Sequence, residues 1–198
     1  MGQDDTRAKL IEVASVLLAS EGEAGIRLAD VAKKAKVRQS TIFYHFKDRT
    51  DLIEAAQLER YRSTYLDVIE PIRAALKFSD TPDQWEAAVR KVFSDSFVPG
   101  REDVRSARAS VIGMALTSKR LRKSVAEINR EVIEHICALI SVAKERGWVK
   151  DTYSSVALTS VLMSLVHGRT LIEIDSEFEH FSEWNHLAVD LAISLLTA

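Results

Sequence analysis

The sequence predicts an all-α protein. Apolar residues recur every three or four positions along most of the chain, which is the spacing of amphipathic helices. Only seven Gly and three Pro interrupt its 198 residues, so the connections between helices are expected to be short. No run alternates polar and apolar residues for long enough to indicate a strand. The pattern predicts about nine helices, and 46% hydrophobic residues are enough to pack them around a core.

The first three predicted helices are short and lie close together in the chain. The first covers residues 6–20 and ends before Gly22, which can stop a helix. The second covers residues 28–35, and the third covers residues 39–45. Three residues, 36–38, separate the last two helices. This spacing predicts a helix-turn-helix, a motif whose second helix enters the major groove of DNA.

The third predicted helix separates apolar from polar side chains. Ile42, Phe43 and Phe46 can point inward, whereas its other side chains are expected to lie outward or at the edge of the helix. Those polar side chains are Gln39, Ser40, Thr41, Tyr44 and His45. Hydroxyl, amide and imidazole groups on one exposed face can reach base edges and phosphates.

Positive charge is concentrated around this motif. Between Arg27 and Arg49 there are seven Lys or Arg and only two acids, whereas the whole chain has a net charge of −2. A basic segment in a slightly acidic protein predicts contact with nucleic-acid phosphates by this segment and not by the rest of the chain. The basic helix-turn-helix is therefore expected to bind DNA and the rest of the chain to do something else.

Longer helices follow this N-terminal part. A helix over residues 50–76 is expected to connect a small N-terminal domain, residues 1–50, to a C-terminal domain, residues 77–198. Thr81 and Gln84 resemble a capping box at the start of the next helix. The remaining helices are predicted over residues 82–97, 103–117, 118–146 and 154–174, followed by a last helix for which Ser182 is the expected cap.

Several other classes of protein are disfavoured. The single cysteine, Cys137, excludes an internal disulfide and suits a reduced, cytoplasmic compartment. The most apolar stretch, residues 156–166, is too short to span a membrane. No phosphate-binding, dinucleotide-binding or zinc-finger spacing is present, so no cofactor or metal is expected. The segment of residues 177–186 contains Glu-x-x-His twice, as in di-iron enzymes, but the two copies are too close in the chain to face each other.

The chain resembles the TetR family of bacterial transcriptional regulators over about residues 6–60. Four segments carry the resemblance: Ala14 to Gly22, Leu28 to Val37, Ser40 to Phe46 (STIFYHF) and Lys47 to Leu52. The chain departs from the family pattern where Arg27 replaces a Ser or Thr cap and where Lys36 and Arg38 replace small residues of the turn. The missing cap is expected to cost about 1 kcal/mol.

The resemblance implies a DNA-binding transcriptional regulator and not an enzyme. By analogy with the family, it is expected to be a repressor that a small-molecule effector releases from a palindromic operator in double-stranded DNA. Arg38, Gln39 and Ser40 are the candidates for reading bases. The candidates for phosphate contacts are Thr41, Tyr44, His45, Lys47 and Arg49. Alternatively, Tyr44 packs against the domain, His45 and Arg38 are ordinary surface residues, and Lys33 and Lys34 are a solvated face.

The C-terminal domain is expected to hold a dimer interface and an effector pocket. One short recognition helix buries little surface, so two copies reading a palindrome are expected. The dimer candidates, on the last two helices, are Val161, Leu165, Trp184, Leu187, Leu191 and Leu195. The pocket candidates are Trp85, Phe93, Phe97, Met114, His135, Cys137, Met163 and His167. Arg105, Arg108 and Arg169 are either attractors of an anionic ligand or surface residues.

Two other functions remain as alternatives. The helical body could sense small molecules without any contact with DNA, or the chain could be a di-iron enzyme. The basic segment of residues 27–49 disfavours the first, and the position of the two Glu-x-x-His copies disfavours the second. A gel-shift experiment on random DNA at low salt separates the first from a regulator, and iron content tests the second.

Overall fold

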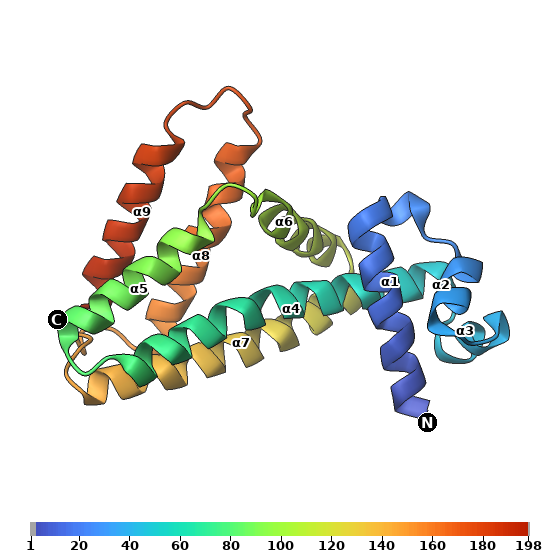
Figure 1. Ribbon diagram of the computed structural model, residues 1–198, viewed down its shortest axis with the longest axis horizontal. Coiled ribbons are helices and arrows are strands. Elements are labelled where there is room, and N and C mark those ends of the chain that lie inside the picture. The colour runs from blue at the N-terminus through green and yellow to red at the C-terminus, as the bar shows by residue number, and fades with distance from the viewer. Residues whose placement is uncertain (1–2, 198) are drawn as a thin grey trace. The chain divides into compact units, whose positions relative to one another are not determined.

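The computed structural model describes residues 3–197, and every regular element among them is a helix (Figure 1). The nine helices are α1 (Gln3–Gly25), α2 (Leu28–Ala35), α3 (Gln39–His45), α4 (Arg49–Phe78), α5 (Pro82–Ser96), α6 (Glu102–Thr117), α7 (Lys119–Glu145), α8 (Ser155–Glu173) and α9 (Phe181–Leu196). The predicted all-α fold is confirmed. The bounds of α2 and α3 agree with the prediction to the residue, whereas α1 begins earlier and ends later than expected.

The later end of α1 has a simple cause. Gly22 has φ 67° and ψ −179°, so the helix is broken there, and a short turn of helix resumes before Gly25. A positive φ is accessible to Gly at little steric cost. Gly22 therefore stops the first helix, as the sequence predicts, but the chain coils once more before α2.

The chain divides into two compact units. Residues 1–63, hereafter the head, include α1, α2, α3 and the first half of α4. Residues 64–198, hereafter the body, include the rest of α4 and helices α5 to α9. The dividing point between Ser63 and Thr64 lies inside one continuous helix.

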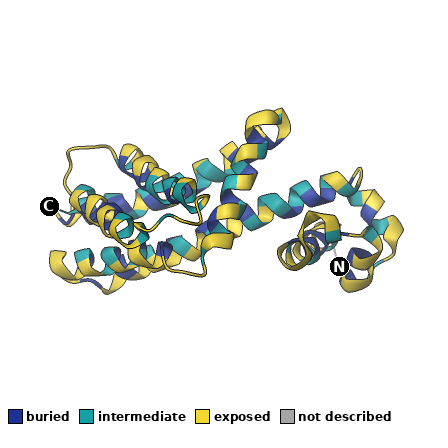
Figure 2. Ribbon diagram, turned by 90° about the horizontal axis from the view of Figure 1, so that it is seen from above, coloured by how far each residue is buried: buried dark blue, intermediate teal, exposed yellow. Residues whose placement is uncertain are grey.

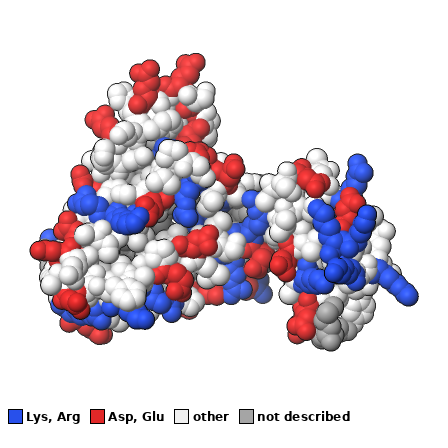
Figure 3. Space-filling view, viewed as in Figure 1, with Lys and Arg blue, Asp and Glu red and all other residues white. Residues whose placement is uncertain are grey.

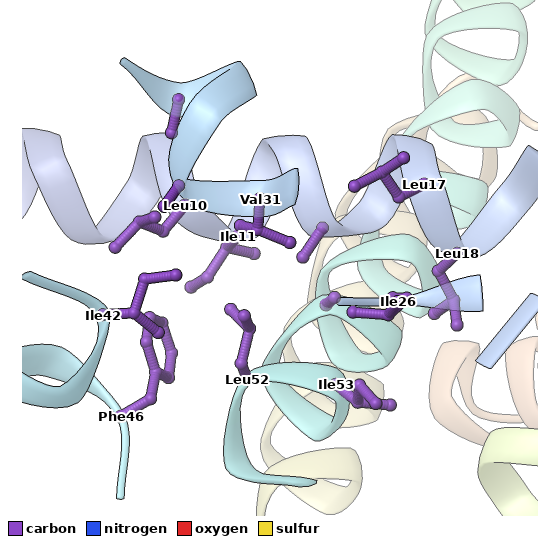
Figure 4. Packing of buried hydrophobic residues seen from close by; sticks show 14 residues of the cluster. Leu10, Ile11, Leu17, Leu18, Ile26, Val31, Ile42, Phe46, Leu52 and Ile53 are labelled. Carbon is purple, nitrogen blue, oxygen red and sulfur yellow. The ribbon is translucent and has the colours of Figure 1, made fainter. Parts of the chain in front are cut away.

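The head packs around its own apolar core (Figure 4). Leu10 and Leu17 of α1 lie in this core with Val31 of α2, Ile42 of α3 and Leu52 of α4, and all are at most 1% exposed. Burying a large aliphatic side chain contributes about 1.5–3 kcal/mol relative to leaving it exposed. Such a core lets helices as short as α2 and α3 hold fixed positions, although isolated helices of this length are unstable in water.

Side chains cap three helices of the body, α5, α7 and α8. The Thr81 hydroxyl accepts from the Gln84 N–H at 3.3 Å, and the Gln84 side chain accepts from the Asp80 N–H at 2.8 Å. Serines also cap α7 and α8. The prediction that Ser182 caps the last helix is wrong, because α9 begins at Phe181 and its first flanking residue, His180, makes no side-chain cap.

Within the body, α8 lies against α6, α7 and α9. It is the one helix of residues 3–197 that is long and apolar enough to cross a membrane by length and composition alone. However, it also carries Arg169, which is 5% exposed in this fold. Figure 2 shows buried and exposed residues alternating along the body helices, as expected for amphipathic helices that pack against one another.

Candidate nucleic-acid interface and effector cavity

The turn between α2 and α3 is built on a strained residue. Lys36 has φ 58° and ψ 42°, the left-handed conformation in which glycine is usual. Its N–H bonds the Lys33 carbonyl at 3.2 Å, and the Val37 N–H bonds the Ala32 carbonyl at 3.0 Å. These two bonds end α2 and turn the chain sharply into α3. The sequence departs from the family pattern here, and the turn forms nevertheless.

One side of α3 is exposed. Arg38, Gln39 and Ser40 are all exposed at the start of the helix, and Arg38 makes no side-chain cap. Tyr44 is 67% exposed, one turn beyond Ser40. The prediction that Phe43 points inward is wrong, because its ring is 55% exposed. Only Ile42 of α3, with Phe46 at its end, fills the core, so this seven-residue helix exposes Gln39, Phe43 and Tyr44.

Two further candidates lie at the edge of this surface. Thr41 and His45 are half-buried. The His45 ring makes an edge contact with the Tyr44 ring at a centroid distance of 5.0 Å. Arg7 of α1, which the sequence analysis missed, lies 5.1 Å from the centroid of the buried Phe46 ring. This contact brings a further cation to the end of α3, and no local pattern in the sequence could have indicated it.

The start of α4 is occupied by the protein's own groups. The Asp48 side chain accepts from the Asp51 N–H at 2.8 Å, and the Asp51 side chain accepts from the Lys47 N–H at 3.1 Å. The Arg49 Nε donates to the Ile26 carbonyl at 2.8 Å, and its guanidinium also donates to the Glu23 carbonyl. Lys47 is exposed. Arg49 therefore ties the end of α1 to the start of α4, whereas Lys47 is the cation of this pair directed to solvent.

Positive side chains gather on the head. Figure 3 shows Lys and Arg clustered on one side of this unit. The exposed Lys and Arg side chains between residues 27 and 47 are Arg27, Lys33, Lys34, Lys36, Arg38 and Lys47. A surface of this kind attracts the phosphates of a nucleic acid at long range.

The body encloses a cavity of about 70 Å³ lined mainly by α4, α5, α7 and α8, with Arg108 of α6 and Leu196 of α9. Four of the eight predicted pocket residues line it: Trp85, Phe93, Met163 and His167. The sequence analysis missed Tyr65 and Val68 of α4, which also line it. The sequence predicts α4 only as a connector between two domains, whereas one side of this helix forms part of the cavity wall.

The polar side chains of the cavity lie at its wall. The Tyr65 hydroxyl and the His167 Nε2 are 2.8 Å apart. Arg108, 4% exposed, donates from its Nε to the Thr64 hydroxyl at 2.9 Å, and its guanidinium lies 4.3 Å from the centroid of the Tyr65 ring. Burial, together with the Arg108 charge, lowers the pKa of His167 to about 4. His167 is therefore neutral at pH 7.

The other four predicted pocket residues do not line this cavity. Phe97 is buried and makes an edge contact with Trp184 at 5.3 Å. His135 is exposed on α7, and its Nδ1 lies 2.8 Å from the Glu131 carbonyl. Met114 is half-buried on α6. Cys137 is half-buried, with its Sγ 3.4 Å from the Thr159 hydroxyl.

Arg105 and Arg169 form a buried ion cluster and are not surface residues. The Arg105 Nε donates to both Glu173 carboxylate oxygens at 2.9 and 3.0 Å. Arg169 lies 3.4 Å from the same carboxylate, and its guanidinium is 4.1 Å from the centroid of the Phe181 ring. Because Glu173 pairs with both arginines and Glu102 lies 3.8 Å from Arg105, these two arginines act as structural links among α6, α8 and α9.

The predicted dimer residues fall into three groups. Leu187 is 67% exposed, and Val161 and Leu191 are exposed by nearly half. Leu165 and Leu195 are half-buried. Trp184 instead packs within its own subunit, against Phe97 and near Arg169. Leu171 and Ile174 of the α8 end, which the sequence analysis did not select, are 74% and 82% exposed.

Among residues 3–197, no group of three His, Cys, Asp or Glu side chains is arranged to hold a metal. In the segment with two Glu-x-x-His copies, the His180 Nδ1 lies 3.3 Å from the Glu183 carboxylate on the exposed surface. The two motifs therefore share an exposed helix start and do not face each other from separate helices.

The head and its exposed α3 define a helix-turn-helix protein of the DNA-binding class. The sequence profile of the bacterial regulatory proteins of the tetR family matches residues 10–56. No curated protein sequence matches the chain. The resemblance predicted from the sequence is confirmed: residues 10–56 carry the tetR-family segment, and the chain has the fold of TetR-family transcriptional regulators.

Solved structures show the same fold over the whole chain. A TetR-family transcriptional regulator from Mesorhizobium loti MAFF303099 has a TM-score of 0.71 and 14% identity, and each chain is covered in full. A TetR-family regulator from a Rhodococcus species has a TM-score of 0.66 and 18% identity, with 98% of this chain and 100% of that chain covered. A transcriptional regulator from Saccharomonospora viridis, in complex with choline, has a TM-score of 0.65 and 18% identity, with 98% and 99% covered.

Proposed function

We propose that this protein is a sequence-specific repressor that binds a palindromic DNA operator as a homodimer and leaves it when a small-molecule effector binds the body. The observation that carries the proposal is the exposed face of α3, flanked by basic residues, in a head that matches the tetR-family segment. Such a protein acts in the cytoplasm, where the chromosome of a bacterium lies.

The residues of α3 divide into two roles. Arg38, Gln39 and Ser40 read bases, because Arg pairs with guanine and Gln with adenine in the major groove. Phe43 joins them, since an exposed ring one turn beyond Gln39 suits contact with a thymine methyl group. Tyr44 adds a hydroxyl for a phosphate on the same exposed side of the helix.

Phosphate contacts surround this helix. Lys47 is exposed and supplies a cation next to α3, and Thr41 and His45 supply shorter polar groups at its edge. Arg7 extends the cationic rim from α1. Arg49 has a different role, because its guanidinium is engaged by the Glu23 and Ile26 carbonyls and holds the helices that carry the other contacts.

Dimerisation through α8 and α9 supplies the second α3. α9 exposes Leu187 and Leu191 one turn apart, and α8 exposes Val161. Exposed apolar patches are characteristic of subunit interfaces. Two copies related by a two-fold axis read half-sites about 34–36 Å apart, or at a multiple of that distance. Leu171 and Ile174 are also exposed, near the end of α8.

The cavity of the body is the proposed effector site. It is lined by residues of α4, the helix that continues into the head. A similar fold is known in complex with a small molecule, choline. A ligand can release the operator only if it binds the DNA-free conformation more tightly than the bound one, and the coupling is typically about 1–3 kcal/mol.

Binding of fluorescent duplex DNA, measured by anisotropy at several salt concentrations, tests the proposal. The affinity is expected to fall steeply as salt rises, because released counterions drive the binding. Gln39→Ala is expected to relax the preference at one base position in each half-site, at a cost of about 1–3 kcal/mol. An affinity that does not depend on salt or on the sequence of the duplex would exclude the proposed function.

A further inference from the structure

The lining of the body cavity selects for an apolar ligand. Most of its described lining side chains are aliphatic or aromatic, contributed by five helices. On α4 the lining residues Tyr65, Val68 and Ile72 follow one face over two turns, about 10 Å at the helical rise. A surface of this kind binds a ligand mainly by removing apolar area from water.

One hydrogen-bond donor in this lining has no partner. The Trp85 side chain is 1% exposed, and no acceptor among residues 3–197 lies within hydrogen-bond distance of its Nε1. A buried donor without an acceptor typically costs about 1–3 kcal/mol. A ligand with one acceptor next to this indole would recover that free energy, so the donor sets a specific polar requirement in an apolar site.

The charges of the lining exclude a cation. Arg108 is the charged residue of the described lining, and no Asp or Glu contributes to it. His167 is neutral because burial keeps its pKa low. A positively charged ligand would lose its hydration, meet a buried guanidinium and find no carboxylate, and each of these effects disfavours its binding.

The Met163 side chain, which lies between the cavity and a neighbouring groove, limits the size of the ligand. At about 70 Å³ the cavity is smaller than the 150 Å³ that accommodates a benzene ring in an engineered protein core. Met163 and His167 line both this cavity and a wider groove of about 390 Å³ between α6, α7 and α8. His167 is held by Tyr65, whereas methionine is unbranched and adapts to gaps. Moving the Met163 side chain would join the two spaces.

We propose that the effector is an apolar, uncharged or anionic molecule with a single hydrogen-bond acceptor that meets the Trp85 indole, and that it reaches past Met163 into the neighbouring groove. The inference rests on the proposed function only in treating the body as an effector domain. The binding itself requires no DNA.

Calorimetric titration of the full chain with three probes of matched shape tests the ligand class. Benzylacetone has an acceptor, butylbenzene has none, and the amine of the benzylacetone skeleton carries a positive charge. Benzylacetone is expected to bind at least about tenfold more tightly than the amine and several-fold more tightly than butylbenzene. Equal binding of the ketone and the amine, or no binding of the ketone, would overturn the proposal.

Two variants then test the named residues. Trp85→Phe removes the donor but keeps a ring, so the ketone is expected to lose about tenfold in affinity while butylbenzene binds as well or better. Met163→Trp blocks the wall and is expected to weaken the ketone about tenfold, whereas Met114→Trp, at a methionine that lines neither space, leaves it unchanged. A ketone affinity insensitive to either lining variant would contradict the assignment of that residue.

The same preparations distinguish the two proposals. If the chain binds duplex DNA with a steep salt dependence but does not bind benzylacetone, the proposed class of effector is wrong and the proposed function as a regulator stands. If the chain binds benzylacetone but not DNA, the proposed function as a regulator is wrong and the proposed ligand site stands. A thermal unfolding curve of each variant, with its midpoint well above the titration temperature, confirms that the variant is folded during the titration.

Discussion

The backbone conformation of Lys36 in the head favours a glycine, whereas its side chain adds a positive charge. Lys36 adopts the left-handed conformation at the end of α2, where a residue with a Cβ atom is strained by about 1–2 kcal/mol. The family pattern has small residues in this turn, whereas this chain has lysine. The turn keeps its shape because two backbone hydrogen bonds and the packing of Val37 against the head core hold it. The cation gained there enlarges the basic surface.

Replacing Lys36 with Gly is therefore expected to stabilise the protein. The free energy of unfolding should rise by about 1 kcal/mol, because Gly adopts this angle without strain. Lys33→Gly removes an equal charge from an ordinary helical position, and is expected to lower the free energy of unfolding by about 0.5–1 kcal/mol. Urea denaturation measures both. If the two variants shift stability in the same direction, the strain at residue 36 is not what limits the turn.

A second residue, His167, gives the body a dependence on pH. Burial and the Arg108 charge lower its pKa in the folded chain to about 4, whereas an unfolded histidine titrates near 6.5. Between these values the unfolded chain holds the extra proton, so stability rises with pH across the window. Below pH 4 both states are protonated, and above 6.5 neither is.

The corresponding variant is His167→Gln, which can still bond the Tyr65 hydroxyl but does not titrate. As pH falls from 6.5 to 4, wild type is expected to lose more stability than the variant, and the two curves should run parallel outside this window. Urea denaturation at a series of pH values measures the difference, in which all other titrating groups cancel. Parallel curves throughout would show that folding does not lower the pKa of His167.

At the scale of helices, the head was largely predictable and its surface was not. The bounds of α2 and α3 follow from the apolar spacing, because Val31, Ala32 and Ile42 must all reach one core. The exposure of Phe43 could not be predicted in this way. A seven-residue helix has few positions that face the core, and the packing of the other helices decides which of its apolar side chains are buried. Arg49 is another example, since its partners are carbonyl groups 23 and 26 residues earlier in the chain.

Arg49 and Lys47 offer a matched pair of variants at this scale. Arg49→Ala is expected to lower the free energy of unfolding by about 1–3 kcal/mol, because the Glu23 and Ile26 carbonyls lose a charged donor. Lys47→Ala is expected to change stability by less than about 0.5 kcal/mol. It should instead weaken binding to every DNA sequence and reduce the salt slope by about one. Equal effects of the two variants on stability would rule out the linking role of Arg49.

In the body, the partners of the buried arginines also could not be predicted from sequence spacing. The sequence leaves Arg105 and Arg169 as ligand attractors or surface residues, but the structure pairs both with Glu173 at the end of α8. The partner of Arg105 lies 68 residues further along the chain, so no local spacing could indicate it. The sequence predicts the lining residues with aromatic or sulfur-containing side chains, such as Trp85. It does not predict aliphatic lining residues such as Val68, because nothing local distinguishes them from ordinary core residues.

At the scale of the whole molecule, fold and partners differ in how directly they follow from the chain. The fold class follows from apolar periodicity and few helix breakers. The two-fold arrangement of heads on DNA is a proposal that rests on the exposed apolar face of α8 and α9, where Leu187 and Ile174 stand out. A face of this kind is costly to leave in water and is expected to be buried between two subunits.

Selection of bound sequences from a random pool of duplex DNA, with the full chain as bait, is the most direct test of this proposal. A two-fold symmetric motif is expected, with half-site centres about one helical turn apart or at a multiple of it. Gln39→Ala should then lose the preference at one position in each half. A pool that shows no enrichment, or an enriched motif without symmetry, would contradict recognition of an operator by paired α3 helices.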